Sequence, residues 1–93
     1  MIEVSGGRMR VTGPMVIDSA ASLKKAGDSA VTAGAAMVDL AAVTEADSAA
    51  LAILLSWLRA AQERKQALMI VNTPENIRSL ATLYGVADML PLS

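Results

Sequence analysis

The residues best suited to chemistry are a carboxylate and a hydroxyl side by side, Asp47 and Ser48. They follow the short apolar run Met37–Leu40, which is typical of a buried strand because it is short and has no helical spacing. Leucines at helical spacing come after them, so the pair lies where a strand passes into a helix. Unpaired backbone N–H groups at a helix start attract a side-chain oxygen or an anion. We therefore take this junction as the candidate site.

Two interpretations of this junction are open. In the first, Asp47 or Ser48 only caps the helix, the commoner role for these residue types, and stabilises it by about 1 kcal/mol. In the second, the Ser48 hydroxyl is presented at the positive end of the helix dipole, where a phosphate or a polar group of a partner is accommodated. The residue pattern alone favours the cap.

Catalytic chemistry has little support in this sequence. There is no cysteine and no histidine, which removes thiol nucleophiles, the commonest general base and the usual zinc ligands. There is also no glycine-rich phosphate loop, and no carboxylates cluster beyond Glu45 and Asp47. We expect no enzyme activity, no catalytic residue, no metal and no cofactor.

Charge and hydrophobicity limit the partners. The chain has eight Lys and Arg residues and nine Asp and Glu residues. The resulting net charge of -1 gives no electrostatic reason to expect binding to nucleic acid or to an anionic membrane. The longest apolar run, Ala49–Leu55, is far shorter than the roughly 20 residues of a membrane helix, and no signal peptide is visible. We expect a soluble, cytoplasmic chain without direct membrane insertion.

The first third of the chain predicts a hairpin and a helix. Two alternating segments flank the Gly6-Gly7 turn, which supplies the positive φ angles of a two-residue loop and places Ile2 opposite Val11. Pro14 should end the second strand because it has no N–H to donate. A helix should then begin near residues 18–19 and run to residue 30, or stop earlier at a glycine at position 27.

The second half predicts a parallel βαβ unit and a last helix. The central helix should follow a polar turn over residues 44–48 and end near residue 62, before a buried strand over residues 68–71. Thr73 can cap the last helix and Pro74 suits its first position, while Tyr84 ends its core stripe and Gly85 closes it. Residues 86–92 should fold back over the sheet edge or the core.

These elements sum to the order β-β-α-β-α-β-α in one domain over residues 1–93. Such an order predicts a small α/β fold, in which helices pack on a mixed sheet that begins with the N-terminal hairpin.

The central helix is apolar almost all round. Its leucines, at positions 51, 54, 55 and 58, form one stripe, and Ile53 and Trp57 lie roughly opposite. A sheet in so small a domain covers only one side, and 54% of the chain is hydrophobic, so we expect a partner or a second copy of the chain to cover Ile53 and Trp57. The competing interpretation is that Trp57 packs under a neighbouring helix or the C-terminal tail.

The segments Val38-Asp39-Leu40 and 43–51 (VTEADSAAL) resemble the STAS domain, the fold of bacterial anti-sigma-factor antagonists. The resemblance covers almost the whole chain, and it implies a STAS fold. The C-terminal segments at 71–74, 77–81 and 83–91 resemble the MlaB-type STAS subunits of bacterial ABC transporters that move phospholipids.

This resemblance implies a non-enzymatic subunit that binds the transporter's cytoplasmic ATPase subunit and, through it, the membrane permease. The protein would then lie peripheral to the inner membrane and support outer-membrane lipid asymmetry. The expected partner-binding residues are the helix start and its apolar face: Asp47, Ser48, Ala49, Ala50, Ile53 and Trp57.

The alternative function is an anti-sigma-factor antagonist that is switched by phosphorylation of Ser48. In the family pattern the second small residue after the hydroxyl is commonly glycine, whereas this chain has Ala50. A methyl group there leaves less room for a kinase, which argues mildly against phosphorylation control and leaves docking to a fixed partner compatible.

Overall fold

The computed structural model describes all 93 residues and confirms the predicted mixed α/β architecture. The strands are β1 (Ile2–Ser5), β2 (Arg8–Met15), β3 (Met37–Ala46) and β4 (Met69–Val71). The helices are α1 (Ala20–Thr32), α2 (Ser48–Glu63) and α3 (Glu75–Leu83), with short 3-10 turns η1 (Ile17–Ser19) and η2 (Ala87–Met89).

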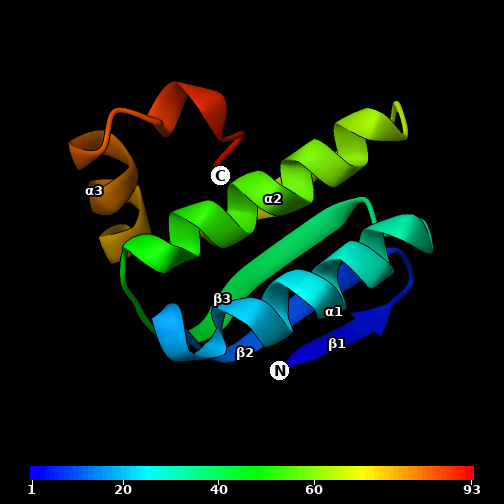
Figure 1. The fold of residues 1–93 in the computed structure, drawn as a ribbon, viewed down its shortest axis with the longest axis horizontal. Helices are drawn as coiled ribbons and strands as arrows, with labels where there is room; N and C mark the ends of the chain where they lie inside the picture. The colour runs from blue at the N-terminus through cyan, green and yellow to red at the C-terminus, as the bar shows by residue number, and fades with distance from the viewer.

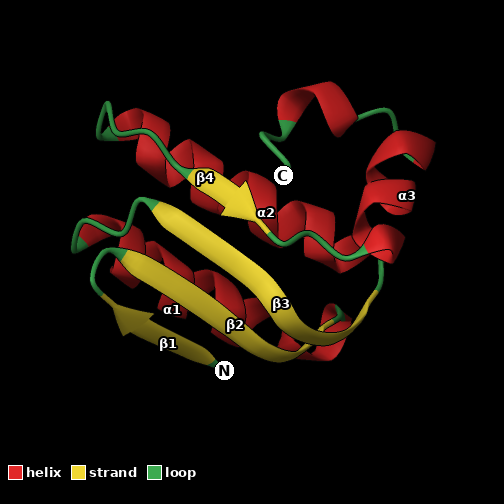
Figure 2. Ribbon diagram, turned by 180° about the vertical axis from the view of Figure 1, so that it is seen from behind, coloured by secondary structure: helices red, strands yellow, loops and turns green.

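The four strands form one sheet in the order β1-β2-β3-β4, antiparallel between β1 and β2 and parallel elsewhere. Helices α1 and α2 lie side by side on one face of the sheet, and α3 and the C-terminal tail lie on the other side of α2 (Figure 1). No helix covers the opposite face (Figure 2). The core therefore lies between the sheet and the α1–α2 layer, and the outer face of the sheet is free.

The hairpin has the predicted register, with Ile2 opposite Val11 across the Gly6-Gly7 turn. The prediction that Pro14 ends the strand was wrong, because β2 continues to Met15. The Thr12 N–H donates toward β1, to the Met1 carbonyl. The backbone nitrogen of Pro14, two residues later, points the same way, but it lies past the first residue of the antiparallel strand β1 and has no acceptor opposite it. Its missing N–H therefore removes no ladder hydrogen bond.

The polar turn predicted over residues 44–48 was also wrong for most of its length. Residues 44–46 continue β3 because the extended end of β2 pairs with them, and Met15 lies opposite Ala46. The turn is reduced to Asp47, after which α2 starts at once. Asp47 therefore lies at the edge of the sheet, between the last residue of β3 and the first residue of α2.

The C-terminal part folds back as expected. Gly85 has a positive φ of 72° and closes α3 with hydrogen bonds from its own N–H to Thr82 and from the Val86 N–H to Ala81. The tail then reaches β4, where Ser93 N–H donates to the Ile70 carbonyl at 2.9 Å. The tail thus covers the β4 edge of the sheet.

Two details of α3 differ from the prediction. Thr73 does not cap the helix, because the chain enters through Pro74 in extended geometry and the helix begins at Glu75. Tyr84 is exposed rather than part of the core, since the helix ends at Leu83 and the ring lies outside its buried stripe of Ile77 and Ala81.

Candidate functional site

Asp47 uses both oxygens of its carboxylate to hold the start of α2. Oδ1 accepts the Ala49 N–H at 2.8 Å, the hydrogen bond of a helix cap. Oδ2 accepts the N–H of Ile17, in the turn between β2 and α1, at 3.2 Å. One side chain therefore satisfies a donor of the helix start and fixes a neighbouring turn beside it. The cap interpretation is confirmed for Asp47.

Ser48 is the first residue of α2, and it is exposed. Because Asp47 supplies the capping oxygen, the Ser48 hydroxyl is not needed for that purpose. Ala49 is half-buried, and Ala52, one turn further along the helix, is exposed. The free side of α2 thus begins with a hydroxyl and continues with small side chains, which allow another backbone to come close.

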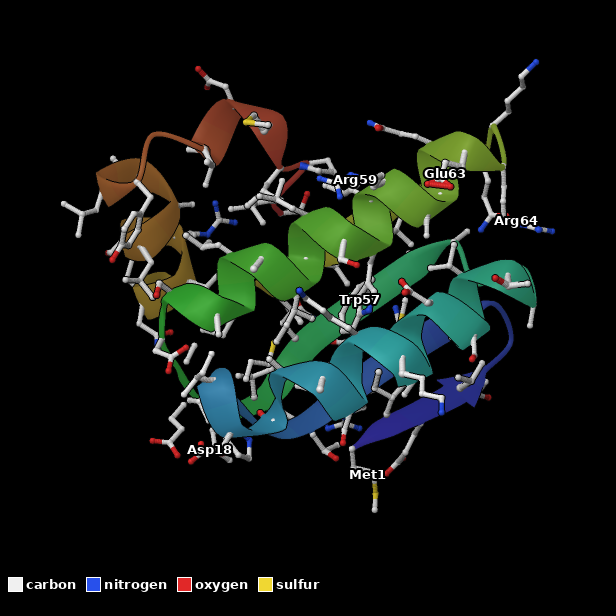
Figure 3. All side chains as sticks on the ribbon, in the orientation of Figure 1. Met1, Asp18, Trp57, Arg59, Glu63 and Arg64 are labelled. Carbon is white, nitrogen blue, oxygen red and sulfur yellow. The ribbon has the colours of Figure 1, made fainter.

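The expectation that Ile53 and Trp57 face a partner was wrong. Both side chains are 0% exposed, because α1 covers the side of α2 that the sheet does not reach. Trp57 points from α2 toward α1 (Figure 3), and its Nε1 donates to the Lys24 carbonyl at 3.3 Å. A Cβ atom at Gly27 of α1 would overlap the indole, so the missing side chain of Gly27 provides the space for the ring. Trp57 therefore belongs to the core.

Ala50 is also completely buried. Its methyl group points into the domain and not toward a partner, so it takes no room from a molecule that approaches Ser48. Ala50 therefore gives no reason to exclude phosphorylation of Ser48, and the expectation that Ala50 contacts a partner was wrong.

Ile17 is a surface residue beside this site that the sequence alone does not single out. This side chain is 72% exposed, and the Asp47 hydrogen bond places its backbone against the start of α2. We call residues 16–19 together with residues 45–49 the α2 corner. A lone isoleucine in the β2–α1 turn carries no periodic signal, so only the three-dimensional fold reveals that its backbone is bonded to Asp47 at the start of α2.

A second polar group, centred on Asp39, lies on the helix-free face of the sheet. Val38 and Leu40 face the core, so Asp39 points the other way. Its Oδ1 accepts hydrogen bonds from the Ala41 N–H at 2.9 Å and from Asn72 Nδ2 at 3.1 Å, and Arg8 lies 3.6 Å from Oδ2.

The pKa of Asp39 lies below its usual value of 3.8, chiefly because of the Ala41 hydrogen bond and then that of Asn72. The charges of Arg8 and Arg10 lower the pKa further, while burial partly offsets these effects. The Arg8 and Asn72 contacts connect β3 to β2 and to the end of β4, while the Ala41 hydrogen bond lies within β3, so we interpret the group as structural.

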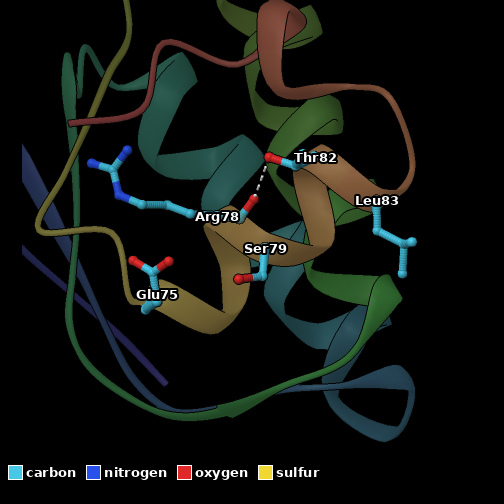
Figure 4. Close-up of a pocket in the computed structure, with 5 residues that line it drawn as sticks. All are labelled: Glu75, Arg78, Ser79, Thr82 and Leu83. Atoms are coloured by element: carbon cyan, nitrogen blue, oxygen red, sulfur yellow. Dashed lines mark hydrogen bonds between the residues drawn. The ribbon is translucent and has the colours of Figure 1, made fainter.

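The largest surface hollow lies on α3 and is lined by Glu75, Arg78, Ser79, Thr82 and Leu83 (Figure 4). All five residues come from one helix, and the Thr82 hydroxyl already donates to the Arg78 carbonyl at 3.1 Å. A hollow lined by a single helix is open to solvent and encloses no ligand.

None of the helices combines the length and the apolar character needed to span a membrane.

Solved structures establish the class of fold. The unphosphorylated anti-sigma-factor antagonist SpoIIAA matches with a TM-score of 0.73 at 13% identity, over 100% of this chain and 86% of that one. A putative antagonist from Thermotoga maritima matches with a TM-score of 0.76 at 14% identity, over 99% and 83% of the two chains. An anti-sigma-factor antagonist from Mycobacterium paratuberculosis matches with a TM-score of 0.75 at 22% identity, over 99% of this chain and 81% of that one. The chain therefore has the STAS fold.

The family follows from the sequence itself. The profile of the family described as "Mlab, STAS domain" matches residues 2–91, and the chain belongs to this family. No curated protein sequence matches it significantly.

Proposed function

We propose that this protein is a non-catalytic accessory subunit of a bacterial ABC transporter for phospholipids. It binds the cytoplasmic ATPase subunit, is linked through it to the membrane permease, and supports the assembly and activity of the complex in maintaining outer-membrane lipid asymmetry. It is thereby cytoplasmic and peripheral to the inner membrane. The observation that carries the proposal is the family match over residues 2–91.

The α2 corner and the free side of α2 supply the docking surface in this proposal. Ser48 and Ala52 are exposed there, and Ala49 is half-buried. Small side chains let a partner helix approach closely, and the Ser48 hydroxyl can pair with a polar group of the partner. Asp47 contributes by holding the corner in shape through its two hydrogen bonds.

The second candidate is a phosphorylation switch at Ser48. It is favoured by the exposure of Ser48 at a helix start, where backbone N–H groups favour an anion. A phosphate there would also meet the neighbouring Asp47 carboxylate, and this repulsion would weaken the corner and any complex built on it.

A pull-down of tagged protein from native membranes, read by mass spectrometry, tests the first proposal. Wild type should recover an ABC ATPase together with its permease, whereas Ala52→Arg should lose them because a long charged side chain blocks close approach. Ala67→Arg is the matched control, since Ala67 is equally an exposed alanine but lies beyond the opposite end of α2. Recovery of a kinase or a sigma-regulating protein, with stoichiometric phosphate on Ser48, would replace the first proposal by the second.

A further inference from the structure

We infer that Ile17 is an apolar anchor of the docking surface, and that its partner offers an apolar pocket with a basic rim. This inference rests on the proposed function and extends the surface from α2 to the turn before α1.

The first observation is the exposure and fixation of Ile17. Its side chain is 72% exposed, although isoleucine is among the residues most often buried. Its backbone is held by the 3.2 Å hydrogen bond to Asp47, and the adjoining Val16 N–H is bonded to the Ser19 hydroxyl at 3.1 Å. A β-branched side chain on a fixed backbone loses little freedom on binding, so its burial by a partner is favourable.

The second observation is the charge around this anchor. The α2 corner contains Asp18, Glu45 and Asp47 and no Lys or Arg. Asp47 is occupied by backbone donors, but Asp18 and Glu45 are exposed, and the only ion pair of the structure is Arg8–Asp39, elsewhere on the sheet. The corner therefore carries negative charge that forms no ion pair within the chain, and a complementary partner surface is basic.

The charge is also separated along the molecule. Asp18 lies near the start of α2, whereas Arg59, Arg64 and a single acid, Glu63, lie toward the opposite end of the helix, where the balance of charge is positive (Figure 3). Such a separation orients an approaching partner before contact, which raises the rate of productive encounters at low salt. It specifies which end of the protein meets the basic surface.

Binding kinetics on the purified, detergent-solubilised transporter complex test the anchor. Ile17→Ala should raise Kd at least about tenfold, mainly through faster dissociation, as expected for an anchor in a pocket. Val4→Ala is the matched control, because Val4 is a β-branched residue that is 56% exposed on β1, and its Kd should equal that of wild type. Ile17 is exposed, so thermal unfolding of Ile17→Ala should match wild type.

The double variant Asp18→Asn with Glu45→Gln tests the basic rim. Its association rate should fall several-fold at low salt, and the rate should depend less on salt than that of wild type. The double variant Glu63→Gln with Asp88→Asn removes the same charge outside the α2 corner and should associate like wild type.

The outcomes separate the inference from the proposed function. If wild type binds the complex but Ile17→Ala binds equally well, or the charge variant associates at the wild-type rate, the corresponding part of the inference is wrong and the proposed function stands. If wild type binds no ABC ATPase, both are overturned.

Discussion

Asp47 and Ser48 are adjacent, but the fold gives them different tasks. Asp47 stabilises the chain by accepting two backbone hydrogen bonds, and Ser48 stays exposed. The pair therefore separates stability from surface chemistry, and substitutions at the two positions should have different effects.

Asp47→Ala should lower the free energy of unfolding by about 1–2 kcal/mol, since it removes the cap and leaves the Ile17 N–H without its acceptor. Ser48→Ala should change it by less than about 0.5 kcal/mol, as is usual for a surface position. Urea unfolding at neutral pH measures both. An equal loss for Ser48→Ala would mean that the hydroxyl takes part in capping.

Asp39 should make stability depend on pH. Its pKa in the folded chain lies below 3.8, so the unfolded chain takes up the proton first as the pH falls. The stabilisation is complete above the pKa of the unfolded chain and is lost as the pH drops through the folded pKa. We expect Asp39→Asn to be less stable than wild type at pH 7 and the difference to shrink in acid. A difference that stays constant to the lowest accessible pH in urea titrations would contradict this.

At the scale of elements, the contact between α1 and α2 depends on one missing side chain. Gly27 lies in the interior of α1, where alanine would ordinarily stabilise a helix by about 0.5–1 kcal/mol. A Cβ at this position would overlap the Trp57 indole, so the expected sign is reversed.

We expect Gly27→Ala to lower the free energy of unfolding by about 1–3 kcal/mol, the usual cost of overpacking. Ser29→Ala, on the exposed side of the same helix, serves as the control and should be neutral or slightly stabilising. In the background of Trp57→Leu the penalty of Gly27→Ala should largely vanish, because the ring that it meets is gone. Calorimetry of wild type, the two single variants and the double variant measures this coupling. Additive effects at positions 27 and 57 would contradict the explanation.

At the scale of the whole molecule, the C-terminal tail and the sheet stabilise each other. Leu90 is buried, Ser93 N–H donates to Ile70, and the Thr73 N–H donates to the Ser93 carbonyl at 3.0 Å. The tail thereby covers one edge of the sheet, while β1 forms the other edge.

Removal of residues 91–93 should lower Tm and promote concentration-dependent association, because it uncovers the unpaired backbone groups of β4. Differential scanning calorimetry and light scattering over a range of concentrations measure these effects against the full chain. A truncated chain with the Tm and the mass of the full chain would show that the tail is dispensable.

Much of the fold could be predicted from the sequence because its signals are local. The Gly6-Gly7 turn sets the hairpin register, Asp47 caps α2, and Gly85 ends α3, each through contacts within a few residues. The strand and helix order follows from spacing and from these turns, and the family motif follows from the residues of β3 and α2 themselves.

Which side chains are buried and which remain exposed around α2 was decided only by the tertiary structure. Whether Trp57 is buried depends on Gly27, which lies in a different helix, and whether Ile17 is held against Asp47 depends on the end of β3 reaching the turn before α1. Helix α2 has two apolar faces. The sheet covers one of them, and a sequence pattern does not say which neighbour covers the other. That choice is made by the packing of α1 against α2 on a shared sheet, an arrangement that joins residues far apart in the chain.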